Sequence, residues 1–143
     1  MDGMDYKIIA ALREDAGAPL RKISKRVHMS ESAVRKRVKQ LERKGVIERY
    51  TVVVDPEKLG YNAMAVIDLD TAPEKRQEVI GKLTKIEEVR KLATSTGEHM
   101  ITGEVWAHDN HELADIVIRK IGGIEGVKKV NREVTLEQVK DMC

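Results

Sequence analysis

The chain has 143 residues, of which 41% are apolar, 35% are charged and only 3% are aromatic. This length allows one domain or two small ones, and the composition is that of a globular protein with an aliphatic core. No apolar run approaches the roughly 20 residues of a membrane-spanning helix, and no basic segment leads into an apolar stretch as in a secretory signal, so no membrane partner is expected. The single cysteine, Cys143, excludes an internal disulfide, which is typical of a reducing, cytoplasmic setting.

Charge is distributed unevenly along the chain. Residues 1–50 contain 13 Lys/Arg and 7 Asp/Glu, net +6, whereas residues 51–143 contain 13 and 17, net −4, and the two parts sum to the overall +2. A basic half is a candidate for binding nucleic acid. The acidic half is expected to have a different role.

The first two predicted elements are short helices over residues 5–15 and 19–27. Asp2 or Asp5 can cap the first helix, and Pro19 is tolerated in the first turn of the second. Both segments carry apolar side chains at helical spacing, namely Ile8, Ile9 and Leu12 in the first and Leu20, Ile23 and Val27 in the second.

The third predicted helix spans residues 29–45 and is strongly basic. Ser30 is a suitable N-cap, and Gly45 can adopt the left-handed conformation that ends a helix. One stripe is apolar, and the opposite face collects the polar side chains that we expect to bind DNA, which with the cap are Ser30, Ser32, Arg35, Lys36, Lys39 and Arg43. Six Lys/Arg against two Glu give this segment a net charge of +4. The alternative is a solvated helix with mixed charge, which is what most charge runs are.

Only His28 and Met29 separate the second helix from Ser30. A short helix, a tight turn and a second helix with a basic outer face form the helix-turn-helix pattern, in which the second helix enters the major groove. The turn lacks the usual glycine, so this prediction depends on spacing and polarity.

After Gly45 the pattern becomes extended. Val46–Val54 is predicted as a strand, and Asp55-Pro56 followed by Leu59-Gly60 as a hinge. We therefore expect a DNA-binding domain over residues 1–50, a strand and hinge linker over 51–60, and a second domain over 61–143. Alternating periodicities predict an α+β domain of the ferredoxin-like βαββαβ type, with strands at 62–70, 89–96, 99–108 and 127–137 and helices at 73–85 and 110–121.

An internal repeat supports this arrangement. LTKIEEVRKL (83–92) aligns with IGGIEGVKKV (121–130) at an offset of 38 residues, with Ile, Glu, Val and Lys identical. Both copies cover the end of a predicted helix and the start of a predicted strand. Two similar βαβ units therefore build this domain.

In this fold both helices cover one face of the sheet and leave the other open. The alternation of side chains places Met64, Val66 and Trp106 on the open face. Because apolar residues occur on both faces, we expect a symmetric homodimer that pairs through this face. The alternative is that the N-terminal domain covers it.

The segment LERKGVIERYTVVVDPEKLG (41–60) resembles the junction of the Lrp/AsnC family of transcriptional regulators. The opening MDGMDYKIIAALREDAG, the turn STGEHM (95–100) and the ending TLEQVK (135–140) are similar to that family as well, so the resemblance covers nearly the whole chain. It implies a winged helix-turn-helix joined to a ligand-sensing domain, dimers that pair through open sheets and assemble up to octamers, and amino-acid-responsive control of transcription. Because one dimer engages two half-sites, a palindromic operator in double-stranded DNA is expected.

The resemblance places the effector turn at Gly97, Glu98, His99 and Met100, where the family commonly has a carboxylate in place of Met100. Val130 and Arg132 stand where the family often has threonine. Losing the carboxylate removes a charge-assisted hydrogen bond to an amino group, about 1.5 to 3 kcal/mol. We therefore expect an apolar or anionic ligand, with Arg132 or protonated His99 as the anion's partner, or no ligand.

Two other functions are weighed against DNA binding. His108 and His111, with Asp109 and Glu112, have some of the ligand types of a metal site, but they fall at a strand-to-helix junction where Asp109 or Asn110 is expected to cap the helix, so neither metal nor cofactor is expected. Sirohaem decarboxylases resemble the same family, which leaves an enzyme as the alternative function. No catalytic nucleophile, base and orienting acid can be recognised, and a regulator that is not an enzyme is therefore expected.

Overall fold

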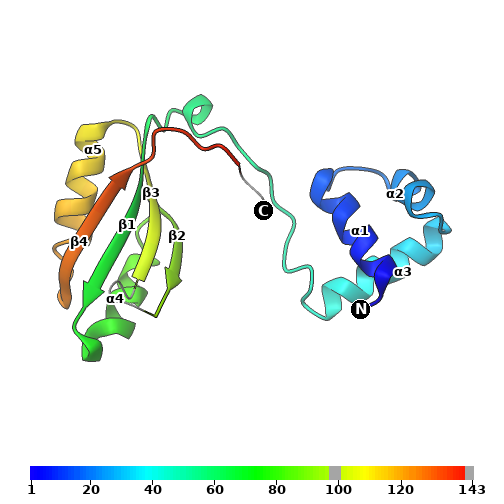
Figure 1. Cartoon of the computed structure of the whole chain (residues 1–143), viewed down its shortest axis with the longest axis horizontal. Helices are drawn as coiled ribbons and strands as arrows, with labels where there is room; N and C mark the ends of the chain where they lie inside the picture. The colour runs from blue at the N-terminus through cyan, green and yellow to red at the C-terminus, as the bar shows by residue number, and fades with distance from the viewer. Residues whose placement is uncertain (97–100, 141–143) are drawn as a thin grey trace. The chain divides into compact units, whose positions relative to one another are not determined.

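The computed structural model describes residues 1–96 and 101–140. The chain divides into two compact units with the boundary between Val53 and Val54 (Figure 1). Each unit has its own hydrophobic core. The two are therefore described separately.

The N-terminal unit consists of three helices, α1 (Gly3–Glu14), α2 (Leu20–Val27) and α3 (Glu31–Arg43) (Figure 1). Asp2 caps α1 and forms a capping box with Asp5, so both candidate caps contribute. Because each helix is apolar along one stripe, the three stripes pack together. Their shared core contains Ile8, Ala11, Ile23, Val27, Val34 and Val38.

The turn between α2 and α3 explains how a helix-turn-helix forms here without glycine. His28 adopts the left-handed conformation with φ +55°. A non-glycine residue seldom occupies this region. With His28 in this conformation, the N–H of the next residue, Met29, donates to the Ser24 carbonyl at 3.0 Å and closes the end of α2. Only His28 and Met29 separate α2 from Ser30, which caps the start of α3.

The strand predicted over Val46–Val54 is not formed, so that prediction is wrong. Residues 46–55 have no helix or strand, and the next element is a single 3₁₀ turn, Glu57–Leu59, which Gly60 ends at φ +91°. A strand requires a neighbour for its backbone N–H and C=O groups, and the described residues of this unit contain no other strand. Val52 and Val53 are 78% and 62% exposed.

The C-terminal unit confirms the βαββαβ prediction. Its elements are β1 (Ala63–Thr71), α4 (Arg76–Leu83), β2 (Val89–Thr94), β3 (Ile101–Ala107), α5 (Asn110–Asp115) with a π-helical continuation (Ile116–Ile121), and β4 (Val127–Val134). The strands form one sheet in the order β2-β3-β1-β4 with antiparallel neighbours. β2, β3 and β4 end one to three residues before their predicted ends, and β1 is shifted by one residue. Residues 99 and 100, where the third strand was predicted to start, lie outside the described residues. Asp109 caps α5 as expected, accepting from the N–H of Glu112 at 2.8 Å.

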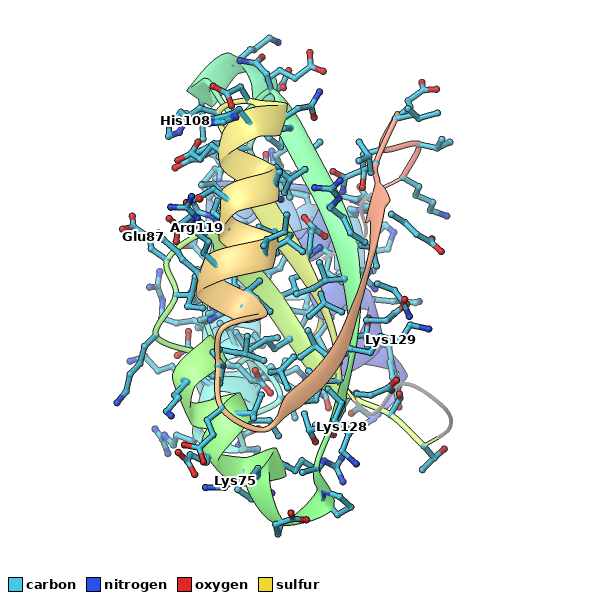
Figure 2. The ribbon with its side chains drawn as sticks, turned by 90° about the vertical axis from the view of Figure 1, so that its left-hand side faces the viewer. Lys75, Glu87, His108, Arg119, Lys128 and Lys129 are labelled. Carbon is cyan, nitrogen blue, oxygen red and sulfur yellow. The ribbon has the colours of Figure 1, made fainter. Side chains whose placement is uncertain are left out.

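Alternation along the two central strands separates a covered face from an open one. In β1 Ala65, Ile67 and Leu69 are fully buried against α4 and α5, and in β3 Val105 is buried beside them. Figure 2 shows α5 lying over the strands. Gly103 permits close contact between β3 and β2, because a Cβ there would lie 2.8 Å from the carbonyl oxygen of Lys91.

The internal repeat is visible in the hydrogen bonds. The N–H of Ile86 donates to Leu83 at the end of α4, and the N–H of Val89 donates to Ile86 as β2 begins, both at 3.1 Å. The corresponding bonds 38 residues later join Ile124 to Ile121 and Val127 to Ile124, again at 3.1 Å. The same sequence pattern therefore makes the same helix-to-strand turn twice.

A matched pair of substitutions in the π-helical segment tests which side of it holds the core. Ile116 is 1% exposed and Ile118 is 69% exposed. Ile116→Ala leaves a cavity and should cost about 2 to 5 kcal/mol of unfolding free energy, whereas Ile118→Ala should stay within about 0.5 kcal/mol. Urea denaturation of the full chain measures both. Equal losses in the two variants would show that the covered face is assigned wrongly.

Candidate nucleic-acid interface

The outer face of α3 presents polar side chains because the opposite stripe is buried. Val34, Val38 and Leu41 are 0%, 8% and 2% exposed. At 100° per residue, this fixes which side chains remain outside. All six residues predicted to bind DNA are exposed: Ser30, Ser32, Arg35, Lys36, Lys39 and Arg43.

The amino-terminal end of this face is ordered by two short-range contacts. The Oγ of Ser30 accepts from the N–H of Ala33 at 3.2 Å and lies 3.3 Å from the Oγ of Ser32. Arg35 donates through Nη2 to Glu31 at 3.0 Å, one turn earlier. An exposed pair of this kind holds the guanidinium weakly, so Arg35 can exchange Glu31 for an anionic ligand.

The cations of α3 are not equivalent. Lys36, Lys39 and Arg43 have no ion pair within the described part of the chain. Arg37, in contrast, binds Asp2 and Asp5 of α1 at 2.8 Å. Its guanidinium lowers the pKa of both carboxyl groups, and they raise the pKa of Arg37. The charge that α3 offers outward is therefore smaller than its sequence indicates.

Sequence reasoning missed the pairing of Arg37 with α1, although the Asp-x-x-Asp start of that helix is a visible signal of a cap. It also missed Arg90, whose guanidinium lies 5.0 Å from the Tyr61 ring centroid and 5.1 Å from that of Trp106. Arg90 donates to the Tyr61 hydroxyl at 2.8 Å. These contacts join Arg90 to residues 29 and 16 positions away in the chain.

The open face of the C-terminal sheet holds the three residues predicted for a dimer interface. Met64 is paired with Trp106 across β1 and β3, and Val66 with Glu104. Val66 is 40% exposed, while Trp106 is partly covered by Tyr61 and Arg90 of its own chain. The face is mixed in character, because Asp68 and Thr102 continue it beyond the apolar end.

Of the five predicted effector residues, only Arg132 lies within the described part of the chain. Gly97, Glu98, His99 and Met100 lie outside the described residues. Arg132 is exposed on β4, opposite Ile67 of β1. Paired residues of neighbouring antiparallel strands point to the same face, so Arg132 lies on the helix side of the sheet and Val66 on the other.

Three of the four residues considered for a metal site, His108, Asp109 and Glu112, bind one another at the start of α5. Nδ1 of His108 and its backbone N–H both lie within 2.8 Å of Oε2 of Glu112, beside the start of α5 (Figure 2). The backbone N–H of His108 is the main cause that lowers the pKa of Glu112. No cluster of three or more potential metal ligands occurs in residues 1–96 and 101–140.

Comparison with known proteins agrees with this geometry in both units. A family model described as winged helix-turn-helix DNA-binding matches residues 1–48, and one described as Lrp/AsnC ligand binding domain matches residues 63–143. The chain is 48% identical to the transcriptional regulator LrpA of Pyrococcus horikoshii over 140 residues, 98% of this chain and 99% of that protein. The chain belongs to the Lrp/AsnC family of transcriptional regulators.

Two further relatives support this assignment. The regulator FL11 of Pyrococcus furiosus is 36% identical over 99% of this chain and 93% of that protein. The crystal structure of a transcriptional regulator from Neisseria meningitidis in complex with L-Met has a TM-score of 0.93 at 25% identity, covering 99% of this chain and 94% of that chain.

Membership of the Lrp/AsnC family makes this protein a DNA-binding transcriptional regulator with a helix-turn-helix unit followed by a ligand-binding domain. The alternative of a sirohaem-decarboxylase-like enzyme is not favoured, because the relatives are named as transcriptional regulators. In the described residues no helix is both long and apolar enough to cross a membrane.

Proposed function

We propose that this Lrp/AsnC regulator binds a palindromic operator as a homodimer and acts without catalysis, in the cytoplasm. In this proposal residues 1–50 bind DNA, residues 51–60 are the linker, and residues 61–143 bind the effector and form oligomers. The observation that carries it is the exposed outer face of α3, where Lys36, Lys39 and Arg43 have no ion pair within the described chain. Cations without partners are suited to a phosphate-lined groove.

We propose a role for each of these side chains from its position along α3. Ser30, Ser32, Arg35 and Lys36 lie in the first turn and a half, the part of a recognition helix that reaches base edges. Arg35 has the planar fork that binds guanine bidentately, and Glu31 already holds it near the helix. Lys39 and Arg43 lie further along and are assigned to the phosphate backbone.

The dimer is proposed to form through the open sheet face, at the apolar end that contains Met64, Val66 and Trp106. A dimer places two copies of α3 on two half-sites about one helical turn apart, which accounts for a palindromic operator. Further assembly of dimers, up to an octamer, follows from the family and is proposed with it. Arg90 holds Trp106 against Tyr61, so Trp106 presents a fixed ring to the partner.

The effector is proposed to be an apolar or anionic small molecule bound with Gly97, Glu98, His99, Met100 and Arg132. The exposed guanidinium of Arg132 supports an anion. The similar regulator of Neisseria meningitidis binds L-Met, which makes methionine the first amino acid to test.

Substitutions on α3 separate base readout from backbone binding. The Arg35→Ala, Lys36→Ala double variant should lose about 1 to 3 kcal/mol or more on a specific site and discriminate less between sequences. Lys39→Ala should weaken binding to all duplexes alike and reduce the slope of log K against log salt by about one. Fluorescence anisotropy over a salt series measures both effects. Operator affinity that is unchanged in the double variant would contradict the assignment of this face.

Charge placed on the open face tests the dimer. Val66→Asp would place a second carboxylate opposite Glu104 and desolvate it in the dimer, so the dimer dissociation constant should rise by more than about tenfold. Ile118→Asp is the matched control, because Ile118 is exposed on the helix side of the sheet. Sedimentation equilibrium compares the two variants. If both stay as dimeric as the unmodified protein, the dimer forms through another surface.

Calorimetric titration with the twenty amino acids tests the effector. Because Met100 cannot pair with an ammonium group, zwitterionic amino acids should bind more weakly than micromolar, and Met100→Asp should create such binding. Micromolar binding of L-Met or glutamine to the unmodified protein would refute the proposed ligand class.

A further inference from the structure

Arg37 joins the recognition helix to the start of α1. Its Nη1 donates at 2.8 Å to both carboxylate oxygens of Asp2 and to Oδ1 of Asp5. The side chains of Arg37 and Asp5 are 28% and 14% exposed, whereas the other ion pairs of this unit join side chains at least 47% exposed. This contact is therefore the least solvated ion pair described in the N-terminal unit.

The two carboxylates are themselves held by the backbone of α1. Asp2 accepts from the N–H groups of Met4 and Asp5 at 2.9 and 3.0 Å, and Asp5 accepts from the N–H of Asp2 at 2.9 Å. Arg37 therefore binds a fixed pair of anions at a helix terminus. Charge-assisted hydrogen bonds to such a pair are short and directional.

Among the described residues, the other side-chain contacts of α3 with α1 and α2 are apolar and provide no such direction. Val34 and Val38 pack against aliphatic side chains of α1 and α2, and aliphatic contacts tolerate small rotations of a helix about its axis. A rotation of about 20° moves a side-chain atom roughly 5 to 6 Å from the axis by about 2 Å. A displacement of that size breaks a hydrogen bond to a base, since these bonds require about 2.7 to 3.2 Å.

We propose that Arg37 is a positioning residue for DNA recognition: by binding Asp2 and Asp5, it fixes the rotation of α3 and with it the placement of Arg35 and Lys36. This inference rests on the proposed DNA-binding face of α3. It makes the cap of α1 part of the recognition apparatus, although neither aspartate is suited to touch DNA. Arg37 acts through other residues and does not itself bind phosphate.

Asp5→Asn separates positioning from a direct role of Arg37 in binding. If Arg37 bound phosphate, removing the Asp5 charge would release its guanidinium and reduce repulsion of DNA, so affinity would rise. If Arg37 positions α3, the same change weakens the pair and specific affinity falls. The two roles of Arg37 therefore predict opposite changes in the affinity of Asp5→Asn for its specific DNA site.

The matched control is Glu14→Gln. Glu14 is another carboxylate of α1 that binds an arginine in fork geometry, Arg26 of α2, at 2.5 and 2.7 Å. The Glu14→Gln substitution also removes one negative charge from α1, but the bonds of Glu14 within the described chain join it to α2 and not to α3. Arg37→Gln removes the positioning cation, and Arg37→Lys keeps a cation that can reach both carboxylates, because one nitrogen makes all three contacts.

The experiment uses the full chain, a duplex selected from genomic DNA with the unmodified protein, and a scrambled duplex. Asp5→Asn and Arg37→Gln should each lower the ratio of specific to non-specific affinity by about fivefold or more, the loss expected for one impaired base contact, with an unchanged salt slope. Glu14→Gln should leave the ratio unchanged, and Arg37→Lys should restore it to within about threefold. The Asp5→Asn, Arg37→Gln double variant should be no worse than Arg37→Gln.

Circular dichroism sets a temperature at which every variant is folded, so a loss of stability does not imitate a loss of specificity. Tighter or unchanged specific binding by Asp5→Asn overturns the proposal. A slope of log K against log salt that is reduced by about one in Arg37→Gln also overturns it, because such a reduction indicates that Arg37 contacts a phosphate. An equal loss of ratio in Glu14→Gln also overturns it. The Arg35→Ala, Lys36→Ala variant is measured in parallel, and its failure to weaken binding would reject the DNA-binding face and not the pairing with α1.

Discussion

Burial of one stripe of α3 against α1 and α2 is the constraint on which the DNA-binding unit depends. With Val34, Val38 and Leu41 inside, the set of side chains on the outer face is fixed to within a small rotation of the helix. The same burial requires the chain to reverse sharply before Ser30, and His28 meets that requirement in a left-handed conformation. A short aliphatic core therefore determines both the turn and the exposed basic face.

Ion pairs with acidic side chains determine which of the cations on α3 remain available to a ligand. Counting Lys and Arg along α3 treats them as one charged surface, but Arg37 is neutralised by two aspartates and Arg35 is shared with Glu31. The cations without partners in the described chain are spaced along one side of the helix, as a groove of phosphates requires. Acidic groups at the start of α1 therefore stabilise the unit while leaving its outer face positive.

The ligand-binding unit divides its sheet in a comparable way. The helices cover the face that contains Ile67 and Leu69, and the other face combines an apolar end near Met64 and Val66 with a polar end near Asp68. The register places Arg132 on the helix side, away from the three open-face residues. A ligand held by Arg132 and a partner held by the open face would therefore use different sides of one sheet.

The sequence alone determined the helix positions, the βαββαβ order, the repeated turns and the six exposed side chains of α3, because each depends on local periodicity and capping that a short window of residues contains. The strand expected over Val46–Val54 could not be settled in that way, since a strand exists only with a neighbour. The pairing of Arg37 with Asp2 and Asp5, the stacking of Arg90 on Tyr61 and Trp106, and the side of the sheet on which Arg132 lies were decided by the tertiary structure. Each joins residues about 16 to 65 positions apart, and their proximity is set by how whole elements pack, which no local pattern encodes.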